Sequence, residues 1–459
     1  MRVNRHLIST HKALKVSVEI ELVRARSGAW TAEVREANSP PFHLHSQYDP
    51  EKEAALFIGG QIRYLKEELP EKIVIYGAGC GHHIQVLVDQ LDTRVIAVEV
   101  WETNVDAFLE AKEKGVYQRL LENDKVTFIV SDDLKDYVKR VGDWERDNIQ
   151  VIIHGPSLKI MPPELAPLRE VLQDYQIRKN SAVAFRHLLD ANFEANAKTF
   201  SSGVSPFLQL PTVPLLLISA GPSLSRSYNQ LRSAYKHCLL GAVGTAMAPL
   251  VENGINPDFA VMTDPQPNMV AQLKGWETKN VPLFFLSTLN YGVVEGYRGP
   301  KYILFQEGYI PAEAEAARRG EPLVNTGGSV ATTLFSLARL LRLSPICLVG
   351  QDLAYTNNMT HVKGSAQQLN WVEQAQGEQV LAFDRKGTVI SPRNLLLYKK
   401  WFEEQARESK ETFYNATEGG AYIEGFSHLK LKDFLDKVGS IDATQAREKF
   451  RQIVRSTTN

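Results

Sequence analysis

Short apolar runs that end in small or polar residues recur along the chain, and a first group of them lies between about residues 70 and 155. Stretches with helical spacing, such as 103–114, separate these runs. Strands that alternate with helices in this way are typical of βαβ units, which build a parallel sheet. The strands that we predict in this group are 73–76, 94–100, 125–130 and 149–156.

A second group of apolar runs begins at residue 213, where a strand leads into a Gly-Pro-Ser turn and a helix. Continuous apolar runs are typical of strands that are buried on both faces of a parallel sheet. Ligands of such sheets bind at the carboxyl ends of the strands, so the residues that follow each run are the candidates for function. The further runs are 239–246, 259–264, 282–287, 301–306 and 345–354.

The flanking segments have other patterns. Residues 15–36 alternate apolar and polar around Ser27-Gly28, which predicts a half-buried hairpin. A helix is expected to begin at Asp49-Pro50, a helical bridge to cover 164–200, and the chain from Pro392 onward to be helical and rich in charge. We therefore predict an α/β fold with two Rossmann-like parallel-sheet units, a small N-terminal β hairpin and a C-terminal helical region. The predicted domains are 1–205, 206–392 and 393–459.

Composition narrows the class of protein. The chain has 459 residues, 44% of them hydrophobic, and a formal net charge of -1. This balance is that of a folded globular protein, and it provides no overall field that would attract nucleic acid. The three cysteines (Cys80, Cys238 and Cys347) lie far apart, which fits buried thiols in a reducing compartment. No apolar run approaches the ~20 residues that span a bilayer, so we expect a cytoplasmic protein without a membrane span.

The first candidate for chemistry is the glycine-rich turn Gly77–Gly81, with Glu99 on the next strand. This arrangement resembles the first motif of a methyltransferase-type Rossmann domain, in which the backbone approaches a nucleoside. The alternative is that the glycines serve only the close packing of helix on strand. His82-His83 follow this turn, but they lack a third metal ligand at a sensible spacing, so we interpret them as cap or surface residues.

The second candidate is the turn after the strand at 213–218. Gly221 permits a tight turn, Pro222 suits the first helical position, and Ser223 with the free amides of a helix start would form a phosphate site. A plain serine N-cap is the alternative. A similar choice applies to Asn325–Thr333, where Gly327, Gly328 and Ser329 open an apolar helix: the turn contacts an anion or a sugar, or it is only a capped helix start.

Two acidic strand ends complete the candidates. Asp264, followed by proline, is positioned to bind a hydroxyl group or a metal, or it only forms the turn. Asp352 and Tyr355 follow another strand, with His361 a few residues on. A carboxylate, a phenol and an imidazole in one loop can activate a hydroxyl nucleophile, with His361 as general base, unless His361 is merely solvated.

Several ordered segments resemble the central domain of the motility-associated-factor (Maf) flagellin glycosyltransferases, and HSQYDPEKEA (45–54) resembles their N-terminal part. The resemblance implies a cytoplasmic transferase that moves a nonulosonic acid, of the pseudaminic or legionaminic acid type, from its CMP-activated form to Ser or Thr of flagellin, as flagellum assembly and motility require. It also implies a central domain similar to bacterial CMP-sialic acid sialyltransferases. The segments are SAGPSL (219–224), AVGTA (242–246), NGINPDFAVMTDPQ (253–266), NTGGSVATTLFSLA (325–338) and LVGQDLAYTNNMTH (348–361).

Carried over residue by residue, the resemblance implies a nucleotide-sugar site and a reacting centre. Asp352, Tyr355 and His361 would face the reacting centre. No Asp-x-Asp pair is present, so we expect no metal ligands and no required cofactor beyond the CMP-nonulosonic acid donor. The residues expected to bind the nucleotide sugar are Gly221, Pro222, Ser223, Thr245, Asp264, Gly327, Gly328 and Ser329.

Other functions remain open from the sequence. The central motifs also resemble an archaeal hydroxymethylpterin pyrophosphokinase, in which the same turn and acids would hold ATP and Mg²⁺. A non-catalytic flagellin-binding export factor with a degenerate site is a further alternative, and a methyltransferase built on Gly77–Gly81 is another. The charged C-terminal helices are interpreted as a packing or solvated element, with acceptor binding as the alternative.

Overall fold

The computed structural model divides the chain into two compact units, Met1–Val183 and Ala184–Asn459, and each is described by itself. It describes residues 7–9, 18–36, 39–68, 70–91, 97–141, 149–200, 202–356, 359–366 and 377–457. Residues 15–17 of the predicted hairpin and 94–96 of a predicted strand lie outside this part of the chain.

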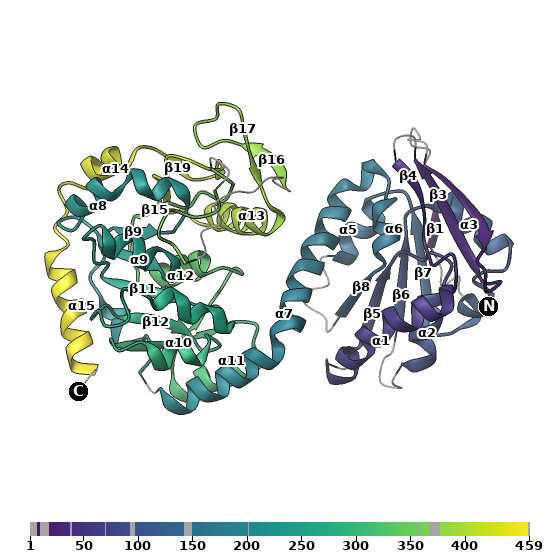
Figure 1. Ribbon diagram of the computed structural model, residues 1–459, viewed down its shortest axis with the longest axis horizontal. Coiled ribbons are helices and arrows are strands. Elements are labelled where there is room, and N and C mark those ends of the chain that lie inside the picture. Colours follow the sequence, from purple (N-terminus) through teal and green to yellow (C-terminus); the bar gives the residue numbers. More distant parts are fainter. Residues whose placement is uncertain are drawn as a thin grey trace. The chain divides into compact units, whose positions relative to one another are not determined.

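The first unit is built on a parallel five-stranded sheet in the order β1-β7-β6-β5-β8 (Figure 1). Residues alternate between its two faces because successive side chains of a strand point in opposite directions. Ile73 and Ile75 pack with the helices of one face, and Val74 and Tyr76 pack with those of the other. The strands are β1 (Leu7–Ser9), β5 (Lys72–Tyr76), β6 (Ala97–Glu102), β7 (Val126–Ser131) and β8 (Ile149–Ile153).

Helices cover both faces of this sheet, as the alternating pattern predicts. Asp49 caps the first of them, because its side chain accepts a 3.0 Å hydrogen bond from the Lys52 amide. On one face lie α1 (Pro50–Glu68), α2 (His82–Gln90), α3 (Val105–Glu113) and α4 (Gln118–Glu122). On the other lie α5 (Lys135–Val141), α6 (Gly155–Lys159) and the first part of α7 (Ala166–Thr199).

The predicted N-terminal hairpin is present and has a third strand. Strands β2 (Glu19–Arg24), β3 (Trp30–Glu36) and β4 (Ser39–His43) form an antiparallel sheet in that order. Ala32, Val34 and Leu44 bury its inner side against Cys80 and Ile160. The chain that leaves β4 is thereby brought next to the glycine-rich turn after β5.

The second unit contains a parallel nine-stranded sheet in the order β14-β13-β12-β11-β10-β9-β15-β18-β19. The strands β9, β10, β11, β12 and β15 are wholly buried, which confirms the interpretation of the continuous apolar runs. The strands are β9 (Leu215–Ile218), β10 (Leu239–Val243), β11 (Phe259–Met262), β12 (Leu283–Leu286), β13 (Lys301–Gln306), β14 (Leu323–Val324), β15 (Ile346–Val349), β18 (Tyr414–Asn415) and β19 (Ser427–His428).

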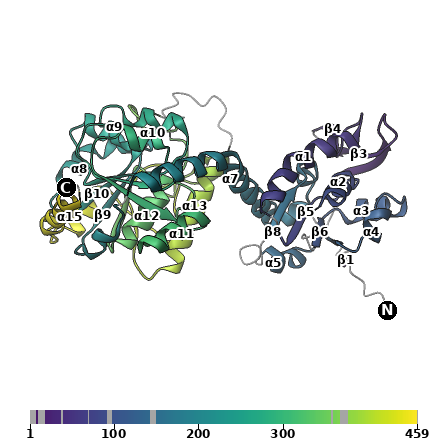
Figure 2. The ribbon, with the colours of Figure 1, turned by 90° about the horizontal axis from the view of Figure 1, so that it is seen from below.

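In each of the two sheets, the order in which consecutive strands are added reverses at one point. In the second unit the strands β9 to β14 follow each other outward, and α12 (Val330–Leu340) then returns the chain to β15 beside β9. In the first unit the reversal lies between β5 and β8. Since crossovers between parallel strands are right-handed, such a reversal opens a crevice at the carboxyl ends of the two strands. Figure 2 shows α9 (Gly244–Glu252) and α10 (Tyr291–Gly296) on the same side of β9 and β10.

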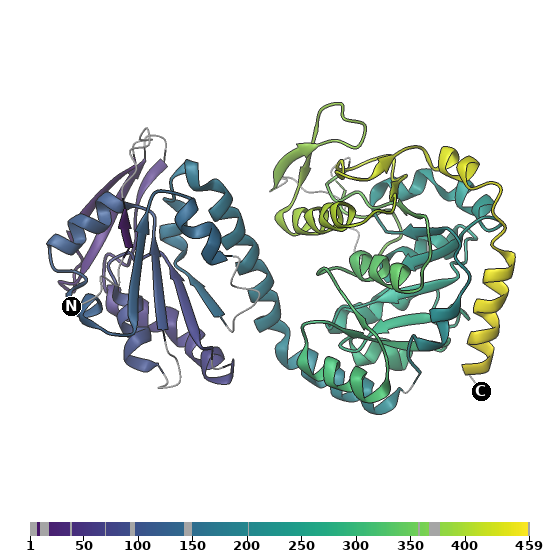
Figure 3. The same ribbon diagram turned by 180° about the vertical axis from the view of Figure 1, so that it is seen from behind.

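The C-terminal region differs from the separate helical domain that was predicted for 393–459. It supplies β18 and β19 to the nine-stranded sheet, together with helices α13 (Arg393–Glu408), α14 (Leu431–Lys437) and α15 (Thr444–Thr457). Phe402, Phe413 and Phe450 lie in the same apolar cluster as the strands, and Figure 3 shows α15 along one edge of the unit. These side chains have no core of their own, so the region belongs to the second unit. Strands β16 (Glu378–Leu381) and β17 (Thr388–Ser391) form a separate antiparallel pair.

The boundary predicted at residue 205 also differs from the division of the chain. The structure separates the units between residues 183 and 184, inside α7, and the last part of this helix packs with the second unit. Asn196, for example, donates hydrogen bonds to the carbonyls of Ser287 and Leu289. No helix among the described residues is long and apolar enough to cross a membrane.

Candidate functional site

Two of the predicted site residues form a buried contact between the strand ends of β9 and β15, where the strand order of the sheet reverses. The Ser223 hydroxyl donates a 2.6 Å hydrogen bond to Oδ1 of Asp352, and the Ser223 amide also faces this carboxylate at 3.3 and 3.4 Å. Thr356 donates to the other carboxylate oxygen, Oδ2, at 2.7 Å. Asp352 therefore links the turn after β9 to its own loop.

This contact changes the role expected of the Gly-Pro-Ser turn. Pro222 to Arg226 form a short 3-10 helix, and Ser223 is buried. The amide that was expected to bind a phosphate already faces a carboxylate, so in this conformation Ser223 positions Asp352. Burial raises the pKa of Asp352, and the hydrogen bonds from Ser223 and Thr356 oppose that rise. Asp352 is likewise a positioning residue here.

Gly221 is required by the same contact. A Cβ atom at this position would lie 2.0 Å from Oδ1 of Asp352 and 2.5 Å from the carbonyl oxygen of Gly350. The Gly221 amide also donates a 2.8 Å hydrogen bond to that carbonyl. The glycine is needed for the close approach of two loops, because its φ of -62° is open to any residue.

Two buried polar atoms at these strand ends have no hydrogen-bond partner among the described residues. They are the Ser219 hydroxyl oxygen, directly after β9, and the side-chain carbonyl oxygen of Gln351, directly after β15. Their residues are only 6% and 8% exposed. An unpaired buried polar group costs about 1–3 kcal/mol, so these atoms mark a place where a polar ligand would be stabilised.

Other strand ends of the second sheet carry polar side chains that satisfy each other. After β12 and at the end of β13, Ser287 donates to Gln306, which in turn donates to Thr288. After β11, the Asp264 carboxylate accepts a 3.0 Å hydrogen bond from the Gln266 amide. The polar side chains at these strand ends are thus occupied with one another, and their part in binding a ligand stays a prediction.

A second part of this edge forms around Gly328. Ser329 caps α12 through a reciprocal pair of hydrogen bonds with Thr332, as the capping alternative expected. Gly327 and Gly328 have φ angles of 53° and 85°, which favour glycine. A Cβ atom on Gly328 would lie 3.4 Å from the ring of Tyr398 in α13. Burial, and to a smaller extent the negative charge of Asp264, raise the pKa of Tyr398.

The remaining predicted residues occupy separate positions. Thr245 lies half-buried in the first turn of α9. The Tyr355 amide donates to the carbonyl of Ile390, and Nδ1 of His361 lies 3.1 Å from the Thr360 hydroxyl. Both side chains are half-buried. Asp352 thus contacts Ser223 and Thr356, and its roles with Tyr355 and His361 at a reacting centre stay predictions.

The fold also brings to these places residues that no sequence pattern indicated. Tyr398 comes from the helical region that was assigned to another domain. Gly419 and Gly420 follow β18, and a Cβ atom on Gly420 would lie 2.0 Å from the Asp352 carbonyl oxygen. The Gly-Gly pair was the one signal available, since adjacent glycines mark a turn or a close approach.

The glycine-rich turn of the first unit is packed by protein. A Cβ atom on Gly77 would lie 2.4 Å from Cβ of Ser157, and one on Gly79 would lie 2.4 Å from Nε2 of His45. A cavity lined by Gly79 and Glu102 has a volume of about 20 Å³, which is room for about one water molecule. This arrangement supports the packing alternative for Gly77–Gly81 over a nucleoside site.

The acidic residue next to that turn is Glu102, whereas Glu99 was expected there. Glu99 lies inside β6, where it forms ion pairs with Lys72 and Arg140. Glu102 ends the strand and accepts a 2.8 Å hydrogen bond from the Ala78 amide in the turn. Burial raises the pKa of Glu102. An acidic residue at this strand end binds a ribose in nucleotide-binding Rossmann folds. In this unit the residue is Glu102, and its carboxylate is buried and bound to the backbone of the turn.

Comparisons with known proteins bear on the second unit. Residues 189–358 match the family model described as 6-hydroxymethylpterin diphosphokinase MptE-like. A solved structure, that of the MAf glycosyltransferase from Magnetospirillum magneticum AMB-1, is similar with a TM-score of 0.49 and 16% sequence identity, over 95% of this chain and 74% of that chain. A search of curated protein sequences found no match. Residues 189–358, which include Ser223 and Asp352, are thus similar to the MptE-like family.

Proposed function

We propose that the second unit is a glycosyltransferase that moves a nonulosonic acid, of the pseudaminic or legionaminic acid type, from its CMP-activated donor to Ser or Thr of flagellin in the cytoplasm. The observation that carries this proposal is the pair of unpartnered buried oxygens of Ser219 and Gln351 at the β9–β15 crevice. Hydroxyl and amino groups of a nucleotide sugar would supply the donors that both oxygens lack. The ordered Maf-like motifs supply the substrate class.

The residues of the second unit would have the following roles in the transfer. Ser223 and Asp352 hold the two loops of the crevice in register, while Asp264, Gly328 and Tyr398 form a second contact region for the donor. His361 takes the proton of the acceptor hydroxyl as its oxygen attacks the anomeric carbon. The bond from that carbon to the phosphate breaks, and CMP leaves with the electron pair. Direct displacement of this kind inverts the anomeric carbon and needs no cofactor beyond the donor.

The first test is a calorimetric titration of the full chain with CMP, in parallel with ATP plus Mg²⁺ and with S-adenosylmethionine. We expect CMP to bind, and Ser219→Ala to weaken it roughly tenfold, which corresponds to ~1.4 kcal/mol for one hydrogen bond. Because that hydroxyl has no hydrogen-bond partner within the part of the chain that the structure describes, the same variant should keep its melting temperature. Ser233→Ala is the matched control, since the Ser233 hydroxyl is exposed on α8 (Tyr228–Ala234) and bonds only to the Gln230 carbonyl.

The other ligands decide between the alternatives. Tight binding of ATP with Mg²⁺ and none of CMP would overturn the transferase proposal in favour of a diphosphokinase. Binding of none of the three would favour a non-catalytic flagellin-binding factor. If CMP binds, flagellin is incubated with CMP-pseudaminic and CMP-legionaminic acid, and the mass of flagellin is measured. His361→Gln should abolish the added mass while CMP still binds; unchanged transfer would exclude His361 as the base.

A further inference from the structure

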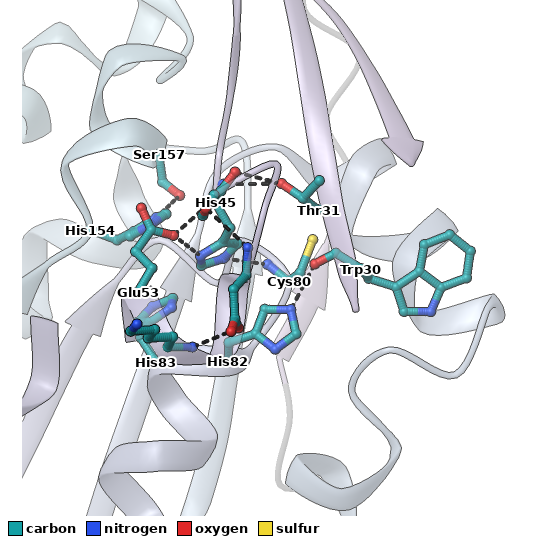
Figure 4. Close-up of polar contacts among 12 residues, drawn as sticks. Trp30, Thr31, His45, Glu53, Cys80, His82, His83, His154 and Ser157 are labelled. Carbon is teal, nitrogen blue, oxygen red and sulfur yellow. Dashed lines mark hydrogen bonds and ion pairs between the residues drawn. The ribbon is translucent and has the colours of Figure 1, made fainter. Parts of the chain in front are cut away.

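Three buried histidines meet at the crevice of the first unit, the place where open α/β sheets bind their ligands. His83 lies in the first turn of α2, His154 follows β8, and His45 lies two residues after β4 (Figure 4). Their exposed fractions are 3% for His45, 1% for His83 and 6% for His154. One ligand nitrogen of each ring lies within 4.8 Å of those of the other two. The sequence showed no third metal ligand near His82-His83. The fold places His45 and His154 next to His83.

Nδ1 of His83 keeps a free lone pair, whereas Nε2 of His45 must give up a hydrogen bond before it can bind a metal. Nε2 of His83 lies 3.0 Å from the Gly77 carbonyl and therefore donates, which leaves Nδ1 as an acceptor. That Nδ1 atom is buried and has no hydrogen-bond partner among the residues that the structure describes. Nε2 of His45 accepts from the Cys80 amide at 3.0 Å, so Nδ1 carries the proton and faces the Glu53 carboxylate at 3.6 Å. Metal-bound histidines commonly donate their second nitrogen to a carbonyl or carboxylate in this way.

The third ring, His154, stacks against both of the others. Its Nδ1 atom lies 2.7 Å from the Ser157 hydroxyl. Its ring centroid is 4.6 Å from that of His83 and 4.7 Å from that of His45.

A carboxylate stands next to the cluster, since an oxygen of Glu53 lies 3.6 Å from Nδ1 of His45. Its negative charge would offset part of the charge of a bound cation.

We propose that His45, His83 and His154 bind one Zn²⁺ ion, with Glu53 or a water molecule as the fourth ligand. Three imidazoles and one oxygen ligand are a donor set typical of zinc. Zinc–nitrogen bonds of about 2.0–2.1 Å place tetrahedral ligand atoms about 3.4 Å apart, so the rings must turn out of their stack and move closer. The ion would join β4, α2 and β8, and the site is independent of the function proposed for the second unit.

The test uses the full chain without a polyhistidine tag, after treatment with a chelator. It is titrated with ZnCl₂ in a calorimeter, with MgCl₂ as a control, and with CoCl₂ followed by visible absorption. We expect one Zn²⁺ per chain, no binding of Mg²⁺, and the visible bands of tetrahedral Co²⁺. His83→Gln should weaken Zn²⁺ binding roughly a hundredfold. His82→Gln should leave it unchanged, because His82 is the neighbouring residue and bonds to the Trp30 carbonyl.

The outcomes separate the proposal from a purely structural stack of histidines. A wild-type chain that binds no Zn²⁺, or a His83→Gln variant that binds it as well as wild type does, overturns the proposal. Circular dichroism establishes that each variant is folded. If His83→Gln does not fold, anomalous scattering at the zinc edge from crystals of the wild-type protein decides: a peak among the three rings supports the site, and a peak elsewhere or none overturns it.

Discussion

The hydroxyl of Ser223 donates a 2.6 Å hydrogen bond to the carboxylate of Asp352, a residue 129 positions away in the sequence. Both residues are nearly inaccessible to solvent. The bond joins the turn after β9 to the loop after β15, at the point where the nine-stranded sheet reverses its direction of growth. The candidate crevice is therefore held in shape by a buried contact between its two sides.

Ser223→Ala should lower the free energy of unfolding of the second unit by about 1.5–3 kcal/mol, the range for a hydrogen bond to a charged group. The alanine removes the donor at 2.6 Å and leaves the buried carboxylate with fewer partners. Urea unfolding followed by circular dichroism measures the change. Ser233→Ala, on the exposed side of α8, is the control, and an equal effect of both variants would contradict the structural role of the contact.

Gly221→Ala should be far more damaging than Gly254→Ala. A methyl group at 221 would overlap the Asp352 carboxylate and the Gly350 carbonyl, so the two loops must separate. Gly254 has a φ of 70° with nothing within 4 Å of an added Cβ atom, so alanine there adds only backbone strain of about 1 kcal/mol. Melting temperatures of both variants make the comparison. Equal shifts would argue against the close approach at 221.

The first unit should lose stability when the pH falls below about 6.5. Folded His83 stays neutral because burial lowers its pKa to about 3, whereas an unfolded histidine takes up a proton near pH 6.5. Between these values the unfolded state binds more protons, so stability falls with pH, by about 2 kcal/mol for this residue between pH 6.5 and pH 5.

Amide hydrogen exchange of β5 and β8 measures the loss of stability in the first unit alone. The exchange is followed by mass spectrometry with a chelator present. His83→Gln should reduce the loss of protection between pH 6.5 and pH 5, because glutamine does not titrate. The same loss in the variant and in wild type would mean that other groups cause the acid sensitivity.

Arg447→Ala should destabilise the second unit by about 3–5 kcal/mol, the cost of leaving a buried charge without its partner. Arg447, in α15, forms a two-point ion pair with Asp258 at 2.7 and 3.1 Å, and its side chain is only 9% exposed. Arg455→Ala is the matched control, since this exposed arginine lies 3.8 Å from Glu448 and such surface pairs contribute little. Unfolding in urea compares the two. An Arg447→Ala effect as small as that of Arg455→Ala would contradict the role of α15 in this unit.

Much of the fold was predictable from local pattern. The buried parallel strands of both units follow the continuous apolar runs, because a strand covered on both faces needs apolar side chains at every position. Strands β18 and β19 have two residues each, too few to show any periodicity. Because these strands were not predicted, residues 393–459 were assigned to a separate domain. For the same reason Tyr398 and Gly420 were not among the predicted site residues.

The residue pattern alone determined where strands end, where helices begin and therefore which polar residues lie at the carboxyl edges. It determined these features because they depend on neighbours within a few positions. Only the tertiary structure decided which of those residues meet: Ser223 with Asp352, Tyr398 with Gly328, and His83 with His45 and His154. Hydrogen bonds and desolvation depend on distance in space, and residues 129 positions apart leave no periodic signal of their contact. For the same reason the turn expected to bind phosphate faces a carboxylate, and the pair of histidines interpreted as surface residues includes one of the most deeply buried side chains of the first unit.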